Sequence, residues 1–412
     1  MDNPQVKGNE NNKNGAKSSK RKAEVPHNST KRKKTVPLQS EDNKVISLLQ
    51  LNPTERDIAI RRLLERYHSS DIPKNVLEEA IDCTALGKSS RHEVIGRMCH
   101  KFLVVLDLFL DSGNSTEKAM TKNSESVLSQ IDMSTRAYER KLDDFIHKLW
   151  PSVTIEAMPK AVIKLCRILI GAQSITRDYC KAAMVSNAVL GPLRSDFRSW
   201  ESLRRRFHIT RREVGSKKKS ARITDLGDLR LVQAAIGYSF RNERLLEDAL
   251  CQLPKDASLQ GRSCQRLEYL GDALLDIFVI EHWADTFPEI GGPKLLQLHG
   301  ASTNRSVFSA ASVNLCLEYH MHYNDPIKKI QVNKMVEDLV VAKWQEKLSD
   351  SRAPYWPAVE IRNKIFCNVY ESLIGAVFAD SDLDLDVTRQ VFQRTLRPIL
   401  VEYLEPQFRE RN

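Results

Sequence analysis

The stretch Gln265-Arg266-Leu267-Glu268-Tyr269-Leu270-Gly271-Asp272-Ala273-Leu274-Leu275 decides the fold of this 412-residue chain. It places Glu268 and Asp272 four residues apart in a sequence that is otherwise apolar nearly all round, which indicates a buried helix. Residues at i and i+4 share one helix face, and carboxylates are rarely buried without a partner. The sequence therefore predicts an acidic face that requires a cation, whereas the ordinary alternative is a solvated, charged helix surface.

A second apolar stretch, Lys364-Ile365-Phe366-Cys367-Asn368-Val369-Tyr370-Glu371-Ser372-Leu373-Ile374-Gly375-Ala376, indicates another buried helix. Asn368 and Glu371 are three residues apart there, again on one helix face. If the two helices pack face to face, they gather oxygen ligands from four positions, which suits Mg²⁺. The predicted site is Glu268, Asp272, Asn368 and Glu371.

These two stretches resemble the two signature helices of the RNase III family, and the combination is most similar to the Dicer-type nucleases. The resemblance implies that the four positions hold divalent metal, Mg²⁺ with Mn²⁺ as a possible substitute, which activates water to hydrolyse double-stranded RNA. Two positions depart from the family pattern. Asn368 stands where the family usually has Asp, and Gln265 replaces a glutamate that is usually peripheral to the metal. We expect three negative charges instead of four, and weaker Mg²⁺ binding.

The first half of the chain resembles the second. Arg91-His-Glu-Val-Ile-Gly-Arg97 aligns with Arg266-Leu-Glu-Tyr-Leu-Gly-Asp272, and the run 160–172 aligns with the run 364–376. In this alignment Glu93 matches Glu268, but Arg97, Lys164 and Arg167 stand opposite Asp272, Asn368 and Glu371. Such a cationic set repels Mg²⁺. The resemblance therefore implies a degenerate first RNase III domain, in a tandem pseudo-dimer like that of Dicer, unless two helical segments are alike by chance.

Helix-period patterning with few alternating strands predicts an all-α fold: a disordered basic tail over 1–40, a degenerate domain over 44–195, a basic connector over 196–224 and the metal-site domain over 225–412. The formal net charge of +10 is concentrated in two segments. Residues 1–40 have ten basic and three acidic residues, and residues 198–222 have ten and two. We expect neither a helicase nor a conventional double-stranded-RNA-binding domain, because roughly thirty residues follow Ala379.

The clusters 20–22 and 31–34 resemble a bipartite nuclear-localisation signal, although a solvated tail that touches RNA nonspecifically would look the same. The chain has no apolar run near 20 residues, so no membrane span is expected. Its eight cysteines form no CxxC pair and are expected to be reduced core thiols of an intracellular protein.

Several other residues are candidates for RNA contact or for support of the site. Asn304 is placed on the helix between the two motifs, where it has either a supporting role or a helix-cap or turn role. Lys364 is either a phosphate contact or an exposed lysine at a helix start. The connector either grips RNA phosphates or is a solvated linker. Its candidate residues are Arg204, Arg205, Arg206, Lys217, Lys218 and Lys219.

The function that these patterns favour is a nuclear, Mg²⁺-dependent endonuclease acting on double-stranded RNA in processing or silencing. A pseudo-dimer with one surviving centre is expected to cut one strand per encounter, and double cleavage would require a second encounter or a homodimer formed through the second domain. The competing hypothesis is a catalytically inactive RNA-binding or scaffold protein, in which Asn368 marks decay. A structural subunit of a ribonucleoprotein such as a ribosome is a third.

Overall fold

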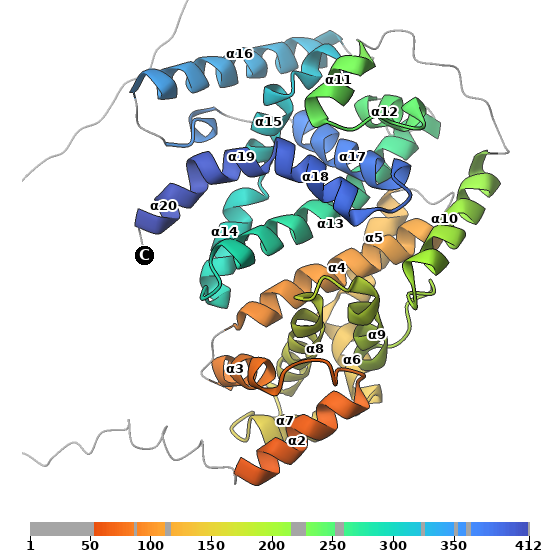
Figure 1. Cartoon of the computed structure of the whole chain (residues 1–412), viewed down its shortest axis with the longest axis vertical. Helices are drawn as coiled ribbons and strands as arrows, with labels where there is room; N and C mark the ends of the chain where they lie inside the picture. Colours follow the sequence, from red (N-terminus) through yellow and green to blue (C-terminus); the bar gives the residue numbers. More distant parts are fainter. Residues whose placement is uncertain are drawn as a thin grey trace, which may run out of the picture. The chain divides into compact units, whose positions relative to one another are not determined.

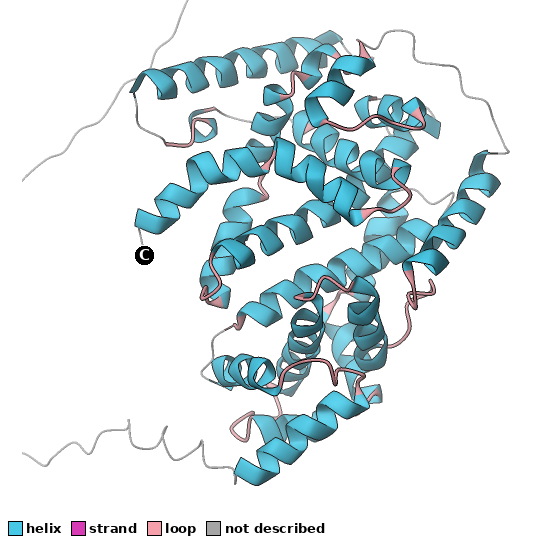
Figure 2. Ribbon diagram, in the orientation of Figure 1, coloured by secondary structure: helices cyan, strands magenta, loops and turns pink. Residues whose placement is uncertain are grey.

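The computed structural model describes residues 53–85, 89–111, 117–215, 228–251, 259–322, 326–349, 353–359 and 364–410. Within these ranges the chain is helical (Figure 2), and its only β-type pairing is an isolated bridge between Cys251 and His322. The all-α prediction is therefore confirmed. The tail 1–40 and the run 217–219 lie outside the described residues. No helix in the described ranges is long and apolar enough to cross a membrane.

All of the described residues belong to one unit, Leu48–Asn412. The helices of its first part, coloured red to yellow-green in Figure 1, are α2 (Pro53–Arg66), α3 (Lys74–Ala85), α4 (Arg91–Asp111), α5 (Glu117–Val127), α6 (Gln130–Glu139), α7 (Asp143–Leu149), α8 (Met158–Ser174), α9 (Tyr179–Leu190) and α10 (Trp200–Gly215). The predicted connector is therefore largely the helix α10.

The second part, coloured green to blue, contains α11 (Leu229–Ile236), α12 (Glu243–Leu250), α13 (Leu259–Thr286), α14 (Gly292–Ser302), α15 (Arg305–Asn314), η2 (Leu317–Tyr319), α16 (Pro326–Ser349), η3 (Trp356–Ala358), α17 (Ile365–Asp380), α18 (Leu385–Thr395), α19 (Arg397–Ile399), η4 (Leu400–Leu404) and α20 (Glu405–Glu410).

Two pairs of core helices, α4 with α8 and α13 with α17, are packed backbone to backbone through glycines. In the second pair, a Cβ atom added to Gly271 would lie 1.8 Å from the carbonyl oxygen of Glu371, and one added to Gly375 would lie 2.1 Å from that of Leu267. No side chain fits at such distances, so glycine is required at both positions. The two sequence motifs are thereby held in direct contact.

The first pair has the same construction. A Cβ atom on Gly96 would lie 1.9 Å from the carbonyl oxygen of Arg167, and one on Gly171 would lie 1.8 Å from that of His92. In the alignment of the two halves, Gly96 matches Gly271, and Gly171 matches Gly375. The backbone atoms that they approach also match, because each lies four residues before the opposite glycine.

Helices α4 and α13 pack against each other, and their contacts come in equivalent pairs. The Arg91 guanidinium donates to the carbonyl oxygen of Ala284 at 3.3 Å, and that of Arg266 donates to the carbonyl oxygen of Phe109 at 3.0 Å. Arg91 aligns with Arg266, and Phe109 aligns with Ala284. Each contact is therefore repeated with the two parts of the chain exchanged. Such reciprocal contacts are the pattern of a two-fold interface.

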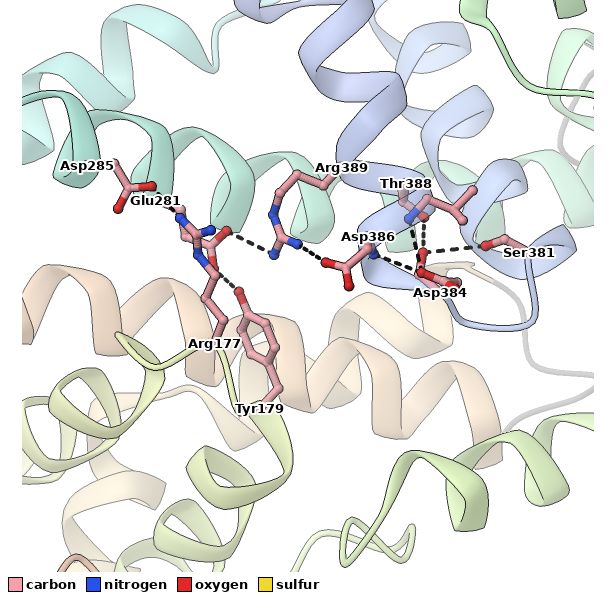
Figure 3. Close-up of polar contacts among 10 residues, drawn as sticks. Arg177, Tyr179, Glu281, Asp285, Ser381, Asp384, Asp386, Thr388 and Arg389 are labelled. Atoms are coloured by element: carbon pink, nitrogen blue, oxygen red, sulfur yellow. Dashed lines mark hydrogen bonds and ion pairs between the residues drawn. The ribbon is translucent and has the colours of Figure 1, made fainter. Parts of the chain in front are cut away.

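A cluster of polar contacts around Glu281 joins α13 to α9 and α18 (Figure 3). The Glu281 carboxylate on α13 accepts hydrogen bonds from the Tyr179 hydroxyl at the start of α9 and from Arg389 on α18, the latter at 3.2 Å. Arg177 pairs with Asp285 one turn farther along α13. Burial raises the pKa of Glu281, whereas Arg389 opposes the rise by favouring the charged carboxylate. These contacts join the first part of the chain to the second.

Candidate functional site

The four predicted site residues lie on the two helices that the glycines hold together. Glu268 and Asp272 project from α13, and Asn368 and Glu371 project from α17. Glu371 is buried, with 8% of its surface exposed, whereas Glu268, Asp272 and Asn368 are half-buried. The predicted face-to-face arrangement of the two motifs is therefore present.

The carboxylates of this face repel one another. Burial and the nearby charge of Asp272 raise the pKa of Glu371 well above its usual range, and Glu268 adds to the rise. Burial and the charge of Asp276 also raise the pKa of Asp272. The Cys367 thiol, one turn before Glu371, donates a hydrogen bond to its Oε1 at 3.1 Å. Buried carboxylates that raise each other's pKa are stabilised by any cation that reaches them.

A cation from the first part of the chain reaches this face. The Lys101 ammonium, on α4, lies 2.7 Å from Oδ2 of Asp272 and 2.5 Å from Oδ2 of Asp276. The imidazole of His299, on α14, lies 2.9 Å from the other oxygen of Asp276. The sequence reasoning missed Lys101, Asp276 and His299. Asp276 gave a signal, since it lies one turn after Asp272 on an apolar helix, and Lys101 matches it in the alignment of the two halves.

The donor chemistry of the face fits a divalent cation. Three carboxylates and one amide oxygen are the hard ligands that Mg²⁺ takes, and the mutual repulsion of the carboxylates is what such an ion relieves. Their arrangement is looser than a formed site, because the described residues include no group of three or more His, Cys, Asp or Glu side chains placed to hold a metal ion. In this arrangement Lys101 supplies the positive charge at Asp272.

The matching positions of the first part are cationic, as the alignment predicts. Arg97 and Arg167 are half-buried on α4 and α8, beside the buried Glu93. Burial and the charge of Arg97 lower the pKa of Arg167, and Glu93 counteracts part of that effect. Lys164 is half-buried one turn before Arg167. Two guanidinium groups close enough to repel each other also repel a divalent cation.

One of the two supporting residues predicted near the site, Asn304, has a helix-capping role. Asn304 lies at the N-cap of α15 and not within a helix, and its side-chain oxygen accepts from the backbone nitrogens of Ser306 and Val307 at 3.0 and 3.1 Å. The cap alternative therefore accounts for Asn304. Lys364 is exposed just before the first residue of α17.

The basic residues of α10 are partly used within the protein. Arg204 donates to the carbonyl oxygen of Asp382 at 2.9 Å, and Arg206 pairs with Asp111. Arg205 is exposed and lies 4.0 Å from Glu201. Because Arg204 and Arg206 anchor α10 to its neighbours, the basic surface free for a nucleic acid is smaller than a count of charges suggests.

Residues 265–382 match the family model of the ribonuclease III domain. Endoribonuclease Dicer homolog 1 of Oryza sativa subsp. japonica is 29% identical over 41% of this chain and 9% of its own length. Endoribonuclease Dicer homolog 2b of the same plant is 22% identical over 87% of this chain and 26% of its own. Dicer-like protein 1 of Aspergillus oryzae is 26% identical over 58% of this chain and 16% of its own.

The chain thus spans 9 to 26% of the length of these relatives. Among solved structures, the nuclease domain of ribonuclease III from Campylobacter jejuni matches 42% of this chain and 97% of its own length at 18% identity, with a TM-score of 0.30. The match of residues 265–382 to the ribonuclease III domain, together with the similarity to Dicer-like endoribonucleases, confirms the resemblance seen in the sequence at the level of this domain.

Proposed function

We propose that this chain is a divalent-cation-dependent endoribonuclease that cleaves double-stranded RNA at the face formed by α13 and α17. One observation carries the proposal: Glu268, Asp272 and Glu371 converge on facing helices inside the segment that matches the ribonuclease III domain. Partly buried carboxylates that raise one another's pKa are typical of binding and catalytic sites.

In this proposal Glu268, Asp272 and Glu371 hold the cation, and Asn368 contributes a neutral oxygen to the cation or to a water on it. Mg²⁺ would polarise the phosphodiester and make a water nucleophilic at neutral pH. The chain's own contribution is rigidity, because the contact of Gly271 with the Glu371 carbonyl fixes the spacing of the two acidic faces. Asn368 lowers the charge of the set by one, so a higher Mg²⁺ concentration, or Mn²⁺, is expected to be needed.

We further propose that the two parts are tandem ribonuclease III-type domains, of which the first has lost its site. The equivalent glycine contacts of the two helix pairs and the reciprocal arginine contacts of α4 and α13 support this. The similarity to Dicer homolog 2b, which extends over 87% of the chain, points the same way. A pseudo-dimer with one retained site cuts one strand per encounter. The basic clusters 20–22 and 31–34 support a nuclear location.

The competing function is RNA binding without cleavage. Two observations favour it: Asn368 replaces a carboxylate, and the Lys101 ammonium already neutralises Asp272. Such a protein would retain the fold and the ability to bind RNA, but it would have lost the ability to bind the cation.

The test is cleavage of a long, end-labelled RNA duplex by the purified chain in Mg²⁺ and then in Mn²⁺. Wild type is expected to nick the duplex, with Mn²⁺ more effective, and Glu371→Gln is expected to abolish nicking without weakening RNA binding. Asn368→Asp should lower the Mg²⁺ concentration required about tenfold, the effect of roughly 1.4 kcal/mol of added attraction. Binding without cleavage in either metal, with cleavage gained in Asn368→Asp, would instead establish the inactive RNA-binding protein.

A further inference from the structure

The first part of the chain has a cavity where the second has its carboxylates. Its volume is about 340 Å³, and Arg97, His100, Lys101 and Arg167 line it together with the apolar side chains of Met98 and Met133. Arg97 and Arg167 are the residues that stand opposite Asp272 and Glu371. The position that corresponds to the carboxylate face is therefore an open pocket, in which Arg97, Lys101 and Arg167 stand opposite the acidic residues Asp272, Asp276 and Glu371.

The guanidinium groups of Arg97 and Arg167 are not paired with a carboxylate in the described part of the chain. Arg194 and Arg206 differ in this respect, because their guanidinium groups pair with Asp111 beside another, larger basic pocket. Glu93 offsets part of the charge at Arg167. Two half-buried guanidiniums that repel each other are stabilised by an anion placed between them.

The remaining polar groups leave room for that anion. Asp276 is the one carboxylate among the lining residues, and it already pairs with Lys101 and His299. His100 is buried, and its burial lowers its pKa to about 3, so it lines the pocket as a neutral imidazole. The net charge that an incoming group meets is therefore positive, and the planar, five-donor guanidinium matches phosphate oxygens.

We propose that this pocket binds a phosphate group of the RNA strand that the α13–α17 face does not cut. The inference rests on the proposed function. The reciprocal contacts of α4 and α13 relate the pocket to the carboxylate face by an approximate two-fold axis, and an RNA duplex has local two-fold axes that exchange its strands. A duplex that places one strand at the carboxylates therefore places the other at Arg97 and Arg167. The pocket fixes the position of the uncut strand.

The test compares wild type with the double variant Arg97→Gln, Arg167→Gln. The matched control is Arg61→Gln, Arg62→Gln, which removes the same charge from exposed positions on α2. Removing two mutually repelling charges does not oppose folding, and thermal unfolding verifies this. The first arm is binding of inorganic phosphate, followed by calorimetry and by the shift of Tm. We expect phosphate binding to wild type and to the control, and its loss in the double variant.

The second arm is binding of duplex RNA as a function of salt. Each phosphate contact contributes a slope of about −0.9 in log K against log salt, so the double variant should lose about one unit of slope and about tenfold in affinity relative to the control. Equal phosphate binding by wild type, the double variant and the control would overturn the proposal. The proposal would also be overturned if the double variant lost phosphate binding but bound RNA as well as the control does. If wild type binds phosphate through these arginines but binds no RNA, the proposed function fails and with it the assignment of an RNA strand. If RNA is bound and nicked while the pocket variant behaves as the control, only the present inference fails.

Discussion

Replacement of Lys101 by methionine tests whether a cation built into the fold competes with the divalent ion. The ammonium of Lys101 contacts Asp272 and Asp276 at 2.7 and 2.5 Å, and Asp272 is one of the proposed ligands. An ion that binds Asp272 must either displace the ammonium or share the carboxylate with it. Lys101→Met keeps most of the apolar stem of the side chain and removes the charge.

The size of the effect follows from burial. The side chain of Asp276 is 10% exposed, and those of Lys101 and Asp272 are 30% and 39% exposed. Removing one partner of a buried ion pair costs about 3–5 kcal/mol, whereas exposed pairs are worth about 0–1 kcal/mol. We expect Lys101→Met to lower the free energy of unfolding by about 2 kcal/mol when no divalent ion is present. The same repulsion then favours the ion, so Mn²⁺ should bind about 30-fold more tightly.

The assay is denaturant unfolding with and without Mg²⁺, together with Mn²⁺ binding followed by electron paramagnetic resonance. Lys160→Met, which removes an exposed lysine from α8, is the control for loss of charge, and Lys101→Arg keeps the charge in place. Divalent ion should restore most of the lost stability in Lys101→Met and add little to the other proteins. Unchanged stability without metal, or Mn²⁺ affinity no higher than that of wild type, would refute the reasoning.

Two further predictions concern the stability of the fold. Gly271→Ala should destabilise the protein by more than about 3 kcal/mol in denaturant unfolding, because the added Cβ meets the Glu371 carbonyl oxygen. The control is Gly300→Ala on α14, where nothing lies within 4 Å, and it should stabilise the protein by about 0.5–1 kcal/mol. Equal effects of the two substitutions would contradict the close contact of α13 with α17. His92 is buried, and burial lowers its pKa to about 4, whereas in the unfolded chain it takes up a proton near pH 6.5. The free energy of unfolding should therefore fall as the pH drops from 6.5 toward 4, by at most about 1.4 kcal/mol per pH unit from this group. If His92→Asn leaves this pH dependence unaltered, His92 is not its origin.

The two facing helices that carry the candidate residues were predictable from the sequence because the patterns that identify them are local. Carboxylates at helical spacing in an apolar run identify α13, and the ending Ile374-Gly375-Ala376 identifies α17. Glycine at the crossing point appears in both motifs, and its reason, a backbone approach too close for any Cβ, is visible only in the packed pair.

What could not be predicted depends on the crossing of distant helices. Lys101 contacts Asp272 only because α4 packs on α13, and no local sequence pattern predicts a partner 171 residues away. The role of Asn304 depended on where α15 begins, and an N-cap and a site residue have the same sequence signature. The α10 arginines were predicted by charge alone, but Arg204 and Arg206 lie against carboxylate and carbonyl groups of neighbouring segments.

The ion pair between Lys101 and Asp276 also bears on which partner the second domain prefers. Lys101 occupies the position in the first part that Asp276 occupies in the second, so under the proposed tandem arrangement the pair spans the approximate two-fold axis. In a homodimer formed through α13, Asp276 would instead approach its own copy, and two like charges close to an axis repel. A charge difference at matching positions thus favours the intramolecular pairing of the two halves over a homodimer. By the same logic, Asp276→Lys should weaken the contact of α4 with α13, and adding Lys101→Asp should restore it by inverting the pair, which unfolding of the single and double variants would measure.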